Sequence, residues 1–385
     1  MIPLSSNIQI ADKKQIGVRV YFAGGGTGGH IYPAVAVAQE LFKIEPSCKI
    51  TFFCSQRPID ARVLAGTGFS FIPLPAMGLS KNPYQFFSFL RSIFAAKKIA
   101  KKTMLDDKPE KAVLFSIGGF VSAGPVLAAK NLKIPVAMLN IDAVPGKANS
   151  FLARYTRDIF VQFARTSNYF GLNNKKVIVT GCPLRGAFFN PDKTKAVEKL
   201  GLSPKKKILL VTGASGGAEN INNVLGYLLD RLQGFAESWQ IVHLAGISHY
   251  DTVRTIYRQA RIGYKVLDYC DDMPNLLAAA DLVIGRAGAM SVAEFAASGT
   301  PAICLPYPYH KDQHQRLNGQ FLVDAGCGRL VDDLCDTEKT AMLLWAVLCE
   351  LMNSDEKRAQ MKRNCAGLAR SDAVVQIARK LLSYR

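Results

Sequence analysis

Residues 18–30 read Val18-Arg19-Val20-Tyr21-Phe22-Ala23-Gly24-Gly25-Gly26-Thr27-Gly28-Gly29-His30. The first six residues predict a buried strand, the glycines predict a turn, and residues 33–41 predict a helix. Such a turn leaves unpaired backbone N–H groups at the positive end of the helix dipole, where glycines let a phosphate approach closely. His30 adds a side chain that exchanges a proton near neutral pH. Similar glycines occur in tight turns of many α/β proteins, but five of them with a histidine favour a reacting site.

Strand-like and helix-like runs alternate along the rest of the chain. Further strands are predicted at residues 49–54, 112–116, 134–140, 158–163 and 176–180, and then at 207–212, 240–245, 265–268, 282–284 and 301–305. Helical patterns fall between them, for example at 222–232 and 290–298, and residues 336–385 are helical in pattern. This alternation predicts parallel sheets with ligands at the carboxyl ends of the strands. The predicted fold class is α/β, with two doubly wound, Rossmann-like domains facing a cleft.

A chain of 385 residues is long enough for two domains. We expect a polar N-terminal extension at residues 1–15, a first domain at 16–188, a second domain at 189–365 and a C-terminal helix at 366–385. Asn190-Pro191 and Ser203-Pro204 lie in the stretch that is expected to connect the domains. The extension lacks the apolar centre of a signal peptide.

The composition is that of an ordered globular protein, with 49% hydrophobic and 20% charged residues. Nine cysteines are scattered without a C-x-x-C pair, which predicts reduced, mostly buried thiols and neither a zinc site nor a disulfide framework. No apolar run approaches the length of a membrane span. These features predict a cytoplasmic protein.

The net charge of +18 is concentrated in the first half of the chain, where residues 1–190 hold 24 Lys and Arg against 9 Asp and Glu. Asn82 and Pro83 predict the start of a helix in this half. Apolar side chains and then lysines follow, at Phe86, Phe87, Phe89, Leu90, Ile93, Phe94, Lys97, Lys98, Lys101 and Lys102. Such a helix suits an anionic membrane surface. A core-facing helix with a solvated lysine end is the alternative, whereas nucleic acid fits poorly because no binding motif is present.

Glycine turns also follow later strands, in the segments 116–125, 212–220 and 285–294. Together they would line a cleft with backbone donors, which suits a nucleotide diphosphate better than NAD. The dinucleotide pattern is not met, because Cys54-Ser55 stands where its acidic residue is expected. No Walker lysine motif is present.

These motifs resemble the MurG family, which transfers GlcNAc from UDP-GlcNAc to the MurNAc 4-hydroxyl of lipid I, an undecaprenyl-pyrophosphoryl-MurNAc-pentapeptide, and so makes lipid II. The resemblance extends from about Val18 onward and is carried by residues 25–30, 118–121 and 213–218, and above all by 271–318. It implies a GT-B fold, with the acceptor in the first domain, the UDP-sugar in the second and a C-terminal helix that crosses back. It further implies a peripheral enzyme on the cytoplasmic face of the inner membrane, and it points to other cell-wall synthesis enzymes as partners.

The resemblance also implies roles for individual residues on the donor side. Glu294 would hold the ribose hydroxyls, the backbone at Cys270 would recognise uracil, and residues 289–291 would seat the pyrophosphate at a helix start. Gln315 and Asn318 would read GlcNAc hydroxyls, with His314 close by. The full set of implied donor contacts is Thr27, Gly28, Gly29, Ser215, Asn222, Cys270, Arg286, Ala289, Met290, Ser291, Glu294, His314, Gln315 and Asn318. We expect neither a metal nor a cofactor, because helix N-termini can neutralise the pyrophosphate.

On the acceptor side, His30 is the expected base, but one segment departs from the family pattern. The family commonly reads H-E-Q-N-A-x-x-G where this chain has Leu139-Asn140-Ile141-Asp142-Ala143-Val144-Pro145-Gly146. We hypothesise that Asp142 replaces part of the missing acceptor contacts and shares the base role. The expected acceptor contacts are Gly26, Gly118, Gly119, Asn140 and Asp142.

Three functions are therefore compatible with the sequence. The first is GlcNAc transfer to lipid I. The second is transfer by a related GT-B enzyme to a different lipid or small-molecule acceptor, which the changed segment would permit. The third is a UDP-sugar epimerase of similar fold or an inactive UDP-sugar-binding subunit. The aromatic and lysine-rich helix disfavours a soluble epimerase, and His30, Glu294 and Gln315 disfavour an inactive subunit.

Overall fold

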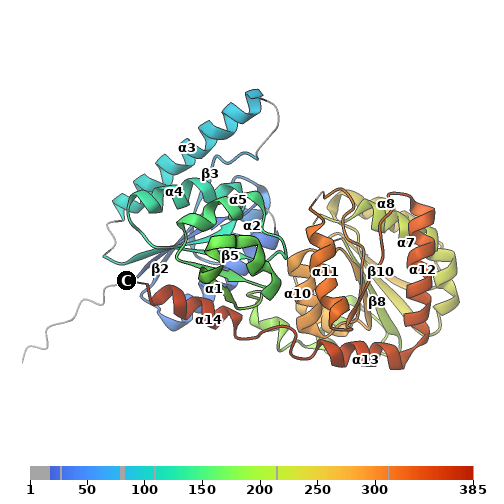
Figure 1. Ribbon diagram of the computed structural model, residues 1–385. Helices are drawn as coiled ribbons and strands as arrows, with labels where there is room; N and C mark the ends of the chain where they lie inside the picture. Colours follow the sequence, from blue (N-terminus) through green and yellow to red (C-terminus); the bar gives the residue numbers. More distant parts are fainter. Residues whose placement is uncertain are drawn as a thin grey trace, which may run out of the picture.

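The computed structural model describes residues 18–26, 28–78, 83–107, 110–213, 216–310 and 312–384, with the backbone alone at 83–85. The predicted extension at residues 1–15, the predicted helix cap Asn82 and the site candidates Thr27 and Ser215 lie outside these residues. The described chain forms two α/β units that lie side by side (Figure 1). The α/β fold with two Rossmann-like units is confirmed.

The first unit is built on a sheet of seven parallel strands in the order β3-β2-β1-β4-β5-β6-β7. These strands are β1 (Arg19–Gly24), β2 (Lys49–Ser55), β3 (Ser70–Leu74), β4 (Ala112–Gly118), β5 (Val136–Asn140), β6 (Asp158–Val161) and β7 (Val177–Val179). The order reverses between β1 and β4. Ligands of doubly wound sheets bind in the crevice that such a reversal opens at the carboxyl ends of the strands.

The second unit is built on a sheet of six parallel strands in the order β10-β9-β8-β11-β12-β13. These strands are β8 (Lys207–Thr212), β9 (Trp239–Leu244), β10 (Gly263–Leu267), β11 (Leu282–Gly285), β12 (Ala302–Cys304) and β13 (Gly328–Leu330). The order reverses between β8 and β11. Each unit therefore has its own ligand crevice, and each crevice begins at a strand that ends in a glycine-containing turn.

Helices cover the sheets. In the first unit they are α1 (Gly28–Ile44), α2 (Pro58–Ala65), α3 (Pro83–Asp106), α4 (Ala123–Asn131) and α5 (Lys147–Leu152). They continue with α6 (Lys193–Leu200), α7 (Glu219–Leu232), α8 (Tyr250–Tyr257), α9 (Met273–Ala279), α10 (Ala289–Ser298), α11 (His314–Asp324), α12 (Thr337–Asn353), α13 (Asp355–Cys365) and α14 (Ala373–Leu382).

The central strands of both sheets are buried on both faces. In β1 every residue after Arg19 is buried, and β9 is buried throughout. This pattern is typical of parallel sheets covered by helices. The sequence missed β3 and β13, because β3 is mostly exposed or half-buried and β13 has three residues.

Helix α1 begins earlier than the sequence suggests. Its first residue is Gly28, and Pro33 lies inside it rather than near its start. A proline was expected to mark the first turn, but the preceding glycines adopt helical geometry as well. His30 therefore belongs to the first turn of a helix and not to a loop, so its direction is set by helix geometry.

The last helix returns to the first unit. Helix α14 packs along α1 (Figure 1), and just after α14 the Tyr384 hydroxyl donates a hydrogen bond to Asp158 at the start of β6. Just before α14, the Arg370 Nη1 donates to the carbonyl oxygen of Val179 at 2.7 Å. These contacts fasten the end of the chain across both units.

Candidate active site

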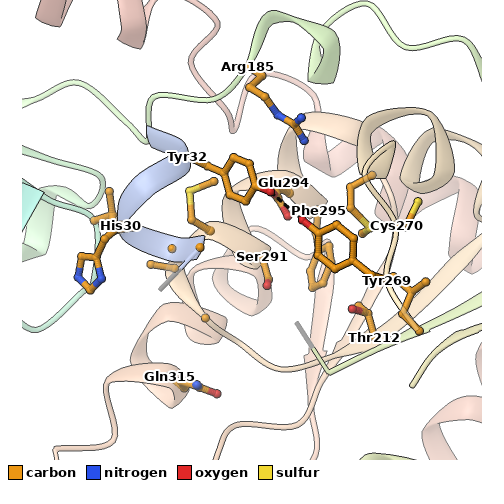
Figure 2. Close-up of a pocket in the computed structure, with 18 of the residues that line it drawn as sticks. His30, Tyr32, Arg185, Thr212, Tyr269, Cys270, Ser291, Glu294, Phe295 and Gln315 are labelled. Atoms are coloured by element: carbon orange, nitrogen blue, oxygen red, sulfur yellow. Dashed lines mark hydrogen bonds between the residues drawn. The ribbon is translucent and has the colours of Figure 1, made fainter. Parts of the chain in front are cut away.

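A pocket of about 430 Å³ lies between the two units, at the carboxyl ends of both sheets. The start of α1, which follows β1, lines one side of the pocket, and the start of α10, which follows β11, lines the other (Figure 2). Its lining includes eleven of the residues expected from the sequence, namely Gly28, Gly29, His30, Asp142, Cys270, Ala289, Met290, Ser291, Glu294, His314 and Gln315. Residues far apart in the sequence are therefore brought together in one cavity.

The glycine turn on the first-unit side is held by a carboxylate that the sequence did not single out. Asp60, in α2, is fully buried, and its oxygens accept hydrogen bonds from the Gly26 amide at 2.8 and 2.9 Å. The same carboxylate accepts from the Ser55 amide at 2.9 Å and from the Ser55 hydroxyl at 2.7 Å. Arg57 Nη1 donates to the Gly26 carbonyl oxygen at 2.8 Å. The turn is fixed by side chains from the segment that runs from the end of β2 into α2.

His30 is half-buried in the first turn of α1, and its imidazole is directed away from Tyr269 and Cys270 (Figure 2). Burial lowers the pKa of His30, and the nearby carboxylates of Asp142 and Asp60 partly oppose this effect. The imidazole is therefore neutral near neutral pH. A neutral imidazole can accept a proton, as a general base must.

The second-unit side of the pocket is formed by the start of α10. Gly288 precedes the helix, and Ala289, Met290 and Ser291 make up its first turn. Backbone N–H groups in the first turn of a helix have no partner within the helix and, with the dipole, favour an anion. The pocket thus offers an anion seat that requires no charged side chain.

Glu294 lies one turn further along α10 and is half-buried in the pocket. Burial raises the pKa of its carboxyl to about 7, and the Arg185 guanidinium acts in the opposite direction. A carboxylate whose pKa burial has raised this far gains from any ligand that donates hydrogen bonds to it. Two adjacent hydroxyls of a ribose are ligands of this kind.

Two tyrosines, which the sequence analysis missed, meet across the pocket. The hydroxyls of Tyr32, in α1, and Tyr269, after β10, are 2.7 Å apart (Figure 2). The guanidinium of Arg185 lies over the Tyr32 ring at 5.2 Å, and that of Arg62 lies over the Tyr269 ring at 5.0 Å. Arg185 follows β7 in the run Gly181-Cys182-Pro183-Leu184-Arg185, where a basic residue after a strand could have been noticed.

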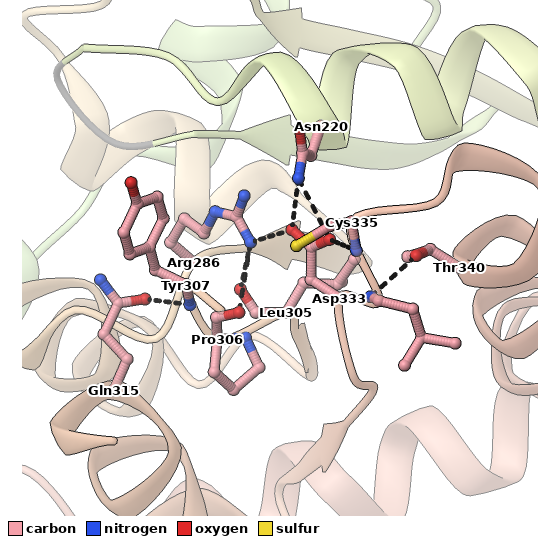
Figure 3. A network of polar contacts seen from close by, with 10 residues as sticks. Asn220, Arg286, Leu305, Pro306, Tyr307, Gln315, Asp333, Cys335 and Thr340 are labelled. Atoms are coloured by element: carbon pink, nitrogen blue, oxygen red, sulfur yellow. Dashed lines mark hydrogen bonds and ion pairs between the residues drawn. The ribbon is translucent and has the colours of Figure 1, made fainter. Parts of the chain in front are cut away.

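His314 and Gln315 begin α11 at the edge of the pocket. His314 Nδ1 lies 2.7 Å from Asp312 Oδ1, and the rings of His314 and His310 are 4.3 Å apart. The Gln315 side-chain oxygen accepts from the Tyr307 amide at 2.9 Å (Figure 3). Its oxygen is thus anchored, and its side chain remains part of the pocket wall.

Three expected donor contacts are bonded to protein groups instead of lining the pocket. The Arg286 guanidinium is buried against Asp333 at 2.8 Å and donates to the carbonyl oxygens of Leu305 and Pro306 (Figure 3). Asn222 is buried between His243 and the Ala245 carbonyl oxygen. Asn318 is also buried and contacts the first unit. The structure thus places these three side chains behind the pocket wall.

The expected acceptor contacts lie around the end of β4 and β5. Gly118 and Gly119 have positive φ angles of 90° and 77°, and a Cβ at Gly118 would lie 2.9 Å from an Asn149 oxygen. Asn140 is buried, accepts from Asn149 at 2.9 Å and donates to the Asp142 carbonyl oxygen at 2.7 Å. Among the expected acceptor contacts, Asp142 lines the pocket, whereas Gly26, Gly118, Gly119 and Asn140 shape the backbone beside it.

Helix α3 projects from the first unit (Figure 1). Its later half packs on α4, with Ala96, Ala100 and Met104 buried. On its free face, Phe87 is 65% and Phe94 is 67% exposed, and Phe86, Lys98, Lys101 and Lys102 are exposed as well. The other residues of the expected surface, Phe89, Leu90, Ile93 and Lys97, are half-buried. Within the described part of the chain, no helix combines the length and apolar character needed to span a bilayer.

Comparison with known proteins identifies relatives along nearly the whole chain. Residues 20–161 match the glycosyltransferase family 28 N-terminal domain, and residues 208–377 match the glycosyltransferase family 28 C-terminal domain. A UDP-N-acetylglucosamine--N-acetylmuramyl-(pentapeptide) pyrophosphoryl-undecaprenol N-acetylglucosamine transferase of Desulfitobacterium hafniense (strain Y51) is 33% identical over 366 residues, which cover 94% of this chain and 97% of the relative.

Solved structures share the fold. The crystal structure of Acinetobacter baumannii MurG has a TM-score of 0.70 at 24% identity, covering 96% of this chain and 99% of that one. A UDP-N-acetylglucosamine 2-epimerase structure has a TM-score of 0.69 at 16% identity, covering 95% of each chain. Because both kinds of enzyme share the fold, the family assignment depends on sequence identity. The full-length relative at 33% identity and the two domain matches decide it: the chain belongs to the MurG family, within glycosyltransferase family 28.

Proposed function

We propose that this protein transfers GlcNAc from UDP-GlcNAc to the 4-hydroxyl of MurNAc in a polyprenyl-pyrophosphate-linked MurNAc-peptide. Its relative from Desulfitobacterium hafniense is named for this reaction. The observation that carries the proposal is the composition of the pocket. A neutral histidine on the first unit lines the same pocket as a helix N-terminus and a half-buried carboxylate on the second.

The donor is held by the second unit. Glu294 accepts hydrogen bonds from both ribose hydroxyls, and the backbone at Cys270 contacts uracil. The pyrophosphate lies at the N-terminus of α10, where the free N–H groups of residues 289–291 and the helix dipole offset its charge. His314 and Gln315 contact the sugar.

The reaction is a single displacement with inversion. His30 takes the proton of the attacking hydroxyl while the hydroxyl oxygen bonds to the anomeric carbon. The bond from that carbon to the phosphate oxygen breaks, and UDP leaves with the electron pair. The charge that develops on UDP is stabilised at the start of α10, and attack opposite to an α-linked leaving group gives a β-glycoside. Because the base belongs to the first unit and the anion-binding helix start belongs to the second, the approach of the two units controls turnover.

We propose peripheral attachment to an anionic membrane through the free face of α3, on the cytoplasmic side. Phe87, Phe94, Lys98 and Lys101 recur at helical spacing on this face and are exposed. Aromatic rings at the acyl boundary with lysines at the headgroups are the arrangement that interfacial helices use. An acceptor with a polyprenyl chain requires such an approach. Contact with other cell-wall synthesis enzymes stays a prediction.

A second acceptor class is supported by one observation. In the segment Leu139–Asp142, polar side chains that are usual in the family are lost or exchanged, so a different lipid-linked or small-molecule acceptor is the alternative substrate. The remaining candidates, an epimerase and an inactive subunit, lack a comparable observation in their favour.

The test is transfer of labelled GlcNAc from UDP-GlcNAc to a short-chain lipid I analogue. We expect product from the unaltered protein and a fall of at least about a hundredfold in kcat for His30→Ala, because a general base contributes this much. UDP binding measured by calorimetry controls for folding. Donor binding without transfer would reject the lipid I acceptor, and conversion of UDP-GlcNAc to its 2-epimer would reject the transferase proposal.

A further inference from the structure

Asn318 joins the two units behind the wall of the pocket. It lies in α11 of the second unit and is 0% exposed. Its side-chain oxygen accepts from the Ala143 amide at 2.7 Å, and its nitrogen donates to Asp142 Oδ1 at 2.9 Å. The same nitrogen donates to the Ala287 carbonyl oxygen at 3.2 Å. One amide thus contacts the loop after β5 in the first unit and the loop after β11 in the second.

The two loops serve opposite sides of the reaction. Ala287 immediately precedes Gly288 and the first turn of α10, which is the proposed pyrophosphate seat. Asp142 lines the pocket on the side of His30. The Asp142 loop is itself rigid, because Asn140 donates to the Asp142 carbonyl oxygen and Thr166 donates to the Ala143 carbonyl oxygen at 3.1 Å. Asn318 therefore connects these two sides through hydrogen bonds to both loops.

The Asn318 amide has no N–H hydrogen left to donate to a sugar hydroxyl. An amide nitrogen has two hydrogens to donate, and Asp142 and Ala287 take both. A sugar hydroxyl could reach this fully buried group only after the contact between the units breaks. Asn318 is consequently a poor reader of GlcNAc in this arrangement, although its sequence position suggested that role.

Neighbouring contacts reinforce the same junction. Arg165 Nη2 donates to the Leu317 carbonyl oxygen at 2.5 Å, and the rings of Phe163 and Phe321 pack edge to face at 5.0 Å. Gln162 Nε2 lies 3.4 Å from the Ala289 carbonyl oxygen, in the first turn of α10. These contacts connect the residues after β6 in the first unit to α10 and α11 in the second.

We propose that Asn318 is a positioning residue, which couples the donor pyrophosphate seat to the Asp142 carboxylate instead of contacting the sugar. Asp142 contributes one oxygen to this coupling and turns the rest of its carboxylate to the pocket. The assignment of the α10 start to the donor and of the Asp142 side to the acceptor depends on the proposed function. The hydrogen-bonded link between the units does not depend on that function, and it can be measured in the protein without substrate.

Amide hydrogen exchange of the full chain tests the link directly, because the Ala143 N–H is bonded to Asn318. Asn318→Leu is similar in size and removes every hydrogen bond of the amide. We expect roughly three- to tenfold faster exchange at Ala143, which corresponds to one hydrogen bond of ordinary strength. Gln320→Leu makes the same kind of change in α11, where Gln320 bonds Asp324 within the helix, and should leave Ala143 unchanged.

Variants of Asp142 separate hydrogen bonding from charge. Asp142→Asn keeps an oxygen for the Asn318 nitrogen and should retain protection at Ala143, whereas Asp142→Ala should lose part of it. This pair also tests the link from the half-buried side if Asn318→Leu does not fold. Unchanged exchange in both Asn318→Leu and Asp142→Ala would overturn the proposal.

Ligand binding and turnover distinguish coupling from sugar recognition. For Asn318→Leu we expect the ratio of UDP-GlcNAc to UDP affinity, measured by calorimetry, to stay within about twofold, while kcat falls tenfold or more. Adding Asp142→Ala should then cost little more, since coupled residues are not additive. A selective loss of UDP-GlcNAc affinity would instead identify Asn318 as a sugar contact. If no acceptor were turned over, the exchange and binding results would still decide the coupling, and the proposed function alone would fail.

Discussion

Both oxygens of the Asp60 carboxylate accept a hydrogen bond from the amide of Gly26, at 2.8 and 2.9 Å from its nitrogen. This contact ties α2 to the glycine turn that leads into α1. The turn therefore owes its shape to a residue that lies 34 positions further along the chain. Glycines alone would permit many shapes, and the buried carboxylate selects one.

Asp60→Ala should destabilise the first unit. The substitution leaves the amides of Gly26 and Ser55 without their acceptor, and a lost hydrogen bond to a charged group costs about 1.5–3 kcal/mol. We expect a loss of about 3 kcal/mol in the free energy of unfolding, measured by urea titration. Asp60→Asn keeps one oxygen and should lose about half as much. Equal stability of Asp60→Ala and the unaltered protein would show that water replaces the carboxylate.

Gly25→Ala should disturb the same turn by steric overlap. Gly25 has a φ angle of 140°, and a Cβ there would lie 2.2 Å from Asp60 Oδ2. Gly68 also has a positive φ, 74°, but a Cβ would meet nothing within 4 Å. Gly68→Ala therefore carries only the backbone cost of about 1 kcal/mol. Gly25→Ala should exceed that cost at least twofold in urea unfolding and weaken UDP binding, while Gly68→Ala should leave UDP binding unchanged.

Most of the fold could be predicted from the sequence because its parallel strands are continuous apolar runs. The strand at 207–212 has the same bounds in the structure, and the helix after it begins three residues earlier than expected. The missed strand β3 is only partly buried, so hydrophobicity does not reveal it. The start of α1 was misplaced because proline was given more weight than the glycines before it.

Site residues within a recognisable local motif could be predicted from the sequence. Site residues whose positions depend on tertiary contacts were harder to predict. Glu294 and the start of α10 were expected from the resemblance to the family, which is carried in part by the glycine turn before this helix. Asp60 was missed because nothing in its local sequence shows that it folds back on a turn 34 residues away. Asn222 and Arg286 were placed beside the donor, but His243 and Asp333, which bond them, are distant in sequence. Tertiary hydrogen bonds of this kind have no local signature.

Donor binding should depend on pH through Glu294. Burial raises the pKa of this carboxyl to about 7, so it is protonated below this pH and ionised above it. An ionised carboxylate accepts from both ribose hydroxyls, whereas a protonated one accepts less well. Affinity should therefore rise with pH up to about 7 and then level off, falling by at most about tenfold for each pH unit below the pKa.

Uridine is the appropriate probe for this dependence, because it carries no phosphate that titrates in the same range. Calorimetry between pH 5.5 and 8.5 should show the rise for the unaltered protein and a flat, weaker profile for Glu294→Gln. The sign for stability is opposite: without ligand, the raised pKa means that the protein loses stability as pH increases from about 4.5 to 7. A flat uridine profile in the unaltered protein would contradict the ribose role.

Membrane binding should separate into an electrostatic and an apolar part. Lys98→Gln with Lys101→Gln should lower binding to anionic vesicles by about 2 kcal/mol, roughly thirtyfold, at low salt. Phe87→Ser with Phe94→Ser should lower binding by an amount that salt does not change. Phe42→Ser is a control, since Phe42 is half exposed on α1. Sedimentation with vesicles of varied anionic content measures both effects, and equal binding by all variants would exclude α3 as the contact.

The pairing of Arg286 with Asp333 predicts a structural rather than a ligand-binding role for both. The two side chains are buried, with 8% and 1% of their surface exposed, and their charged atoms are 2.8 Å apart. Removing one member leaves a buried unpaired charge, so Arg286→Met or Asp333→Leu should cost about 3–5 kcal/mol in unfolding free energy. The double variant should recover a large part of this loss, because no unpaired charge remains. UDP affinity of the folded double variant should stay within about threefold of the unaltered protein. A larger loss of UDP affinity, with stability restored, would return Arg286 to the donor site.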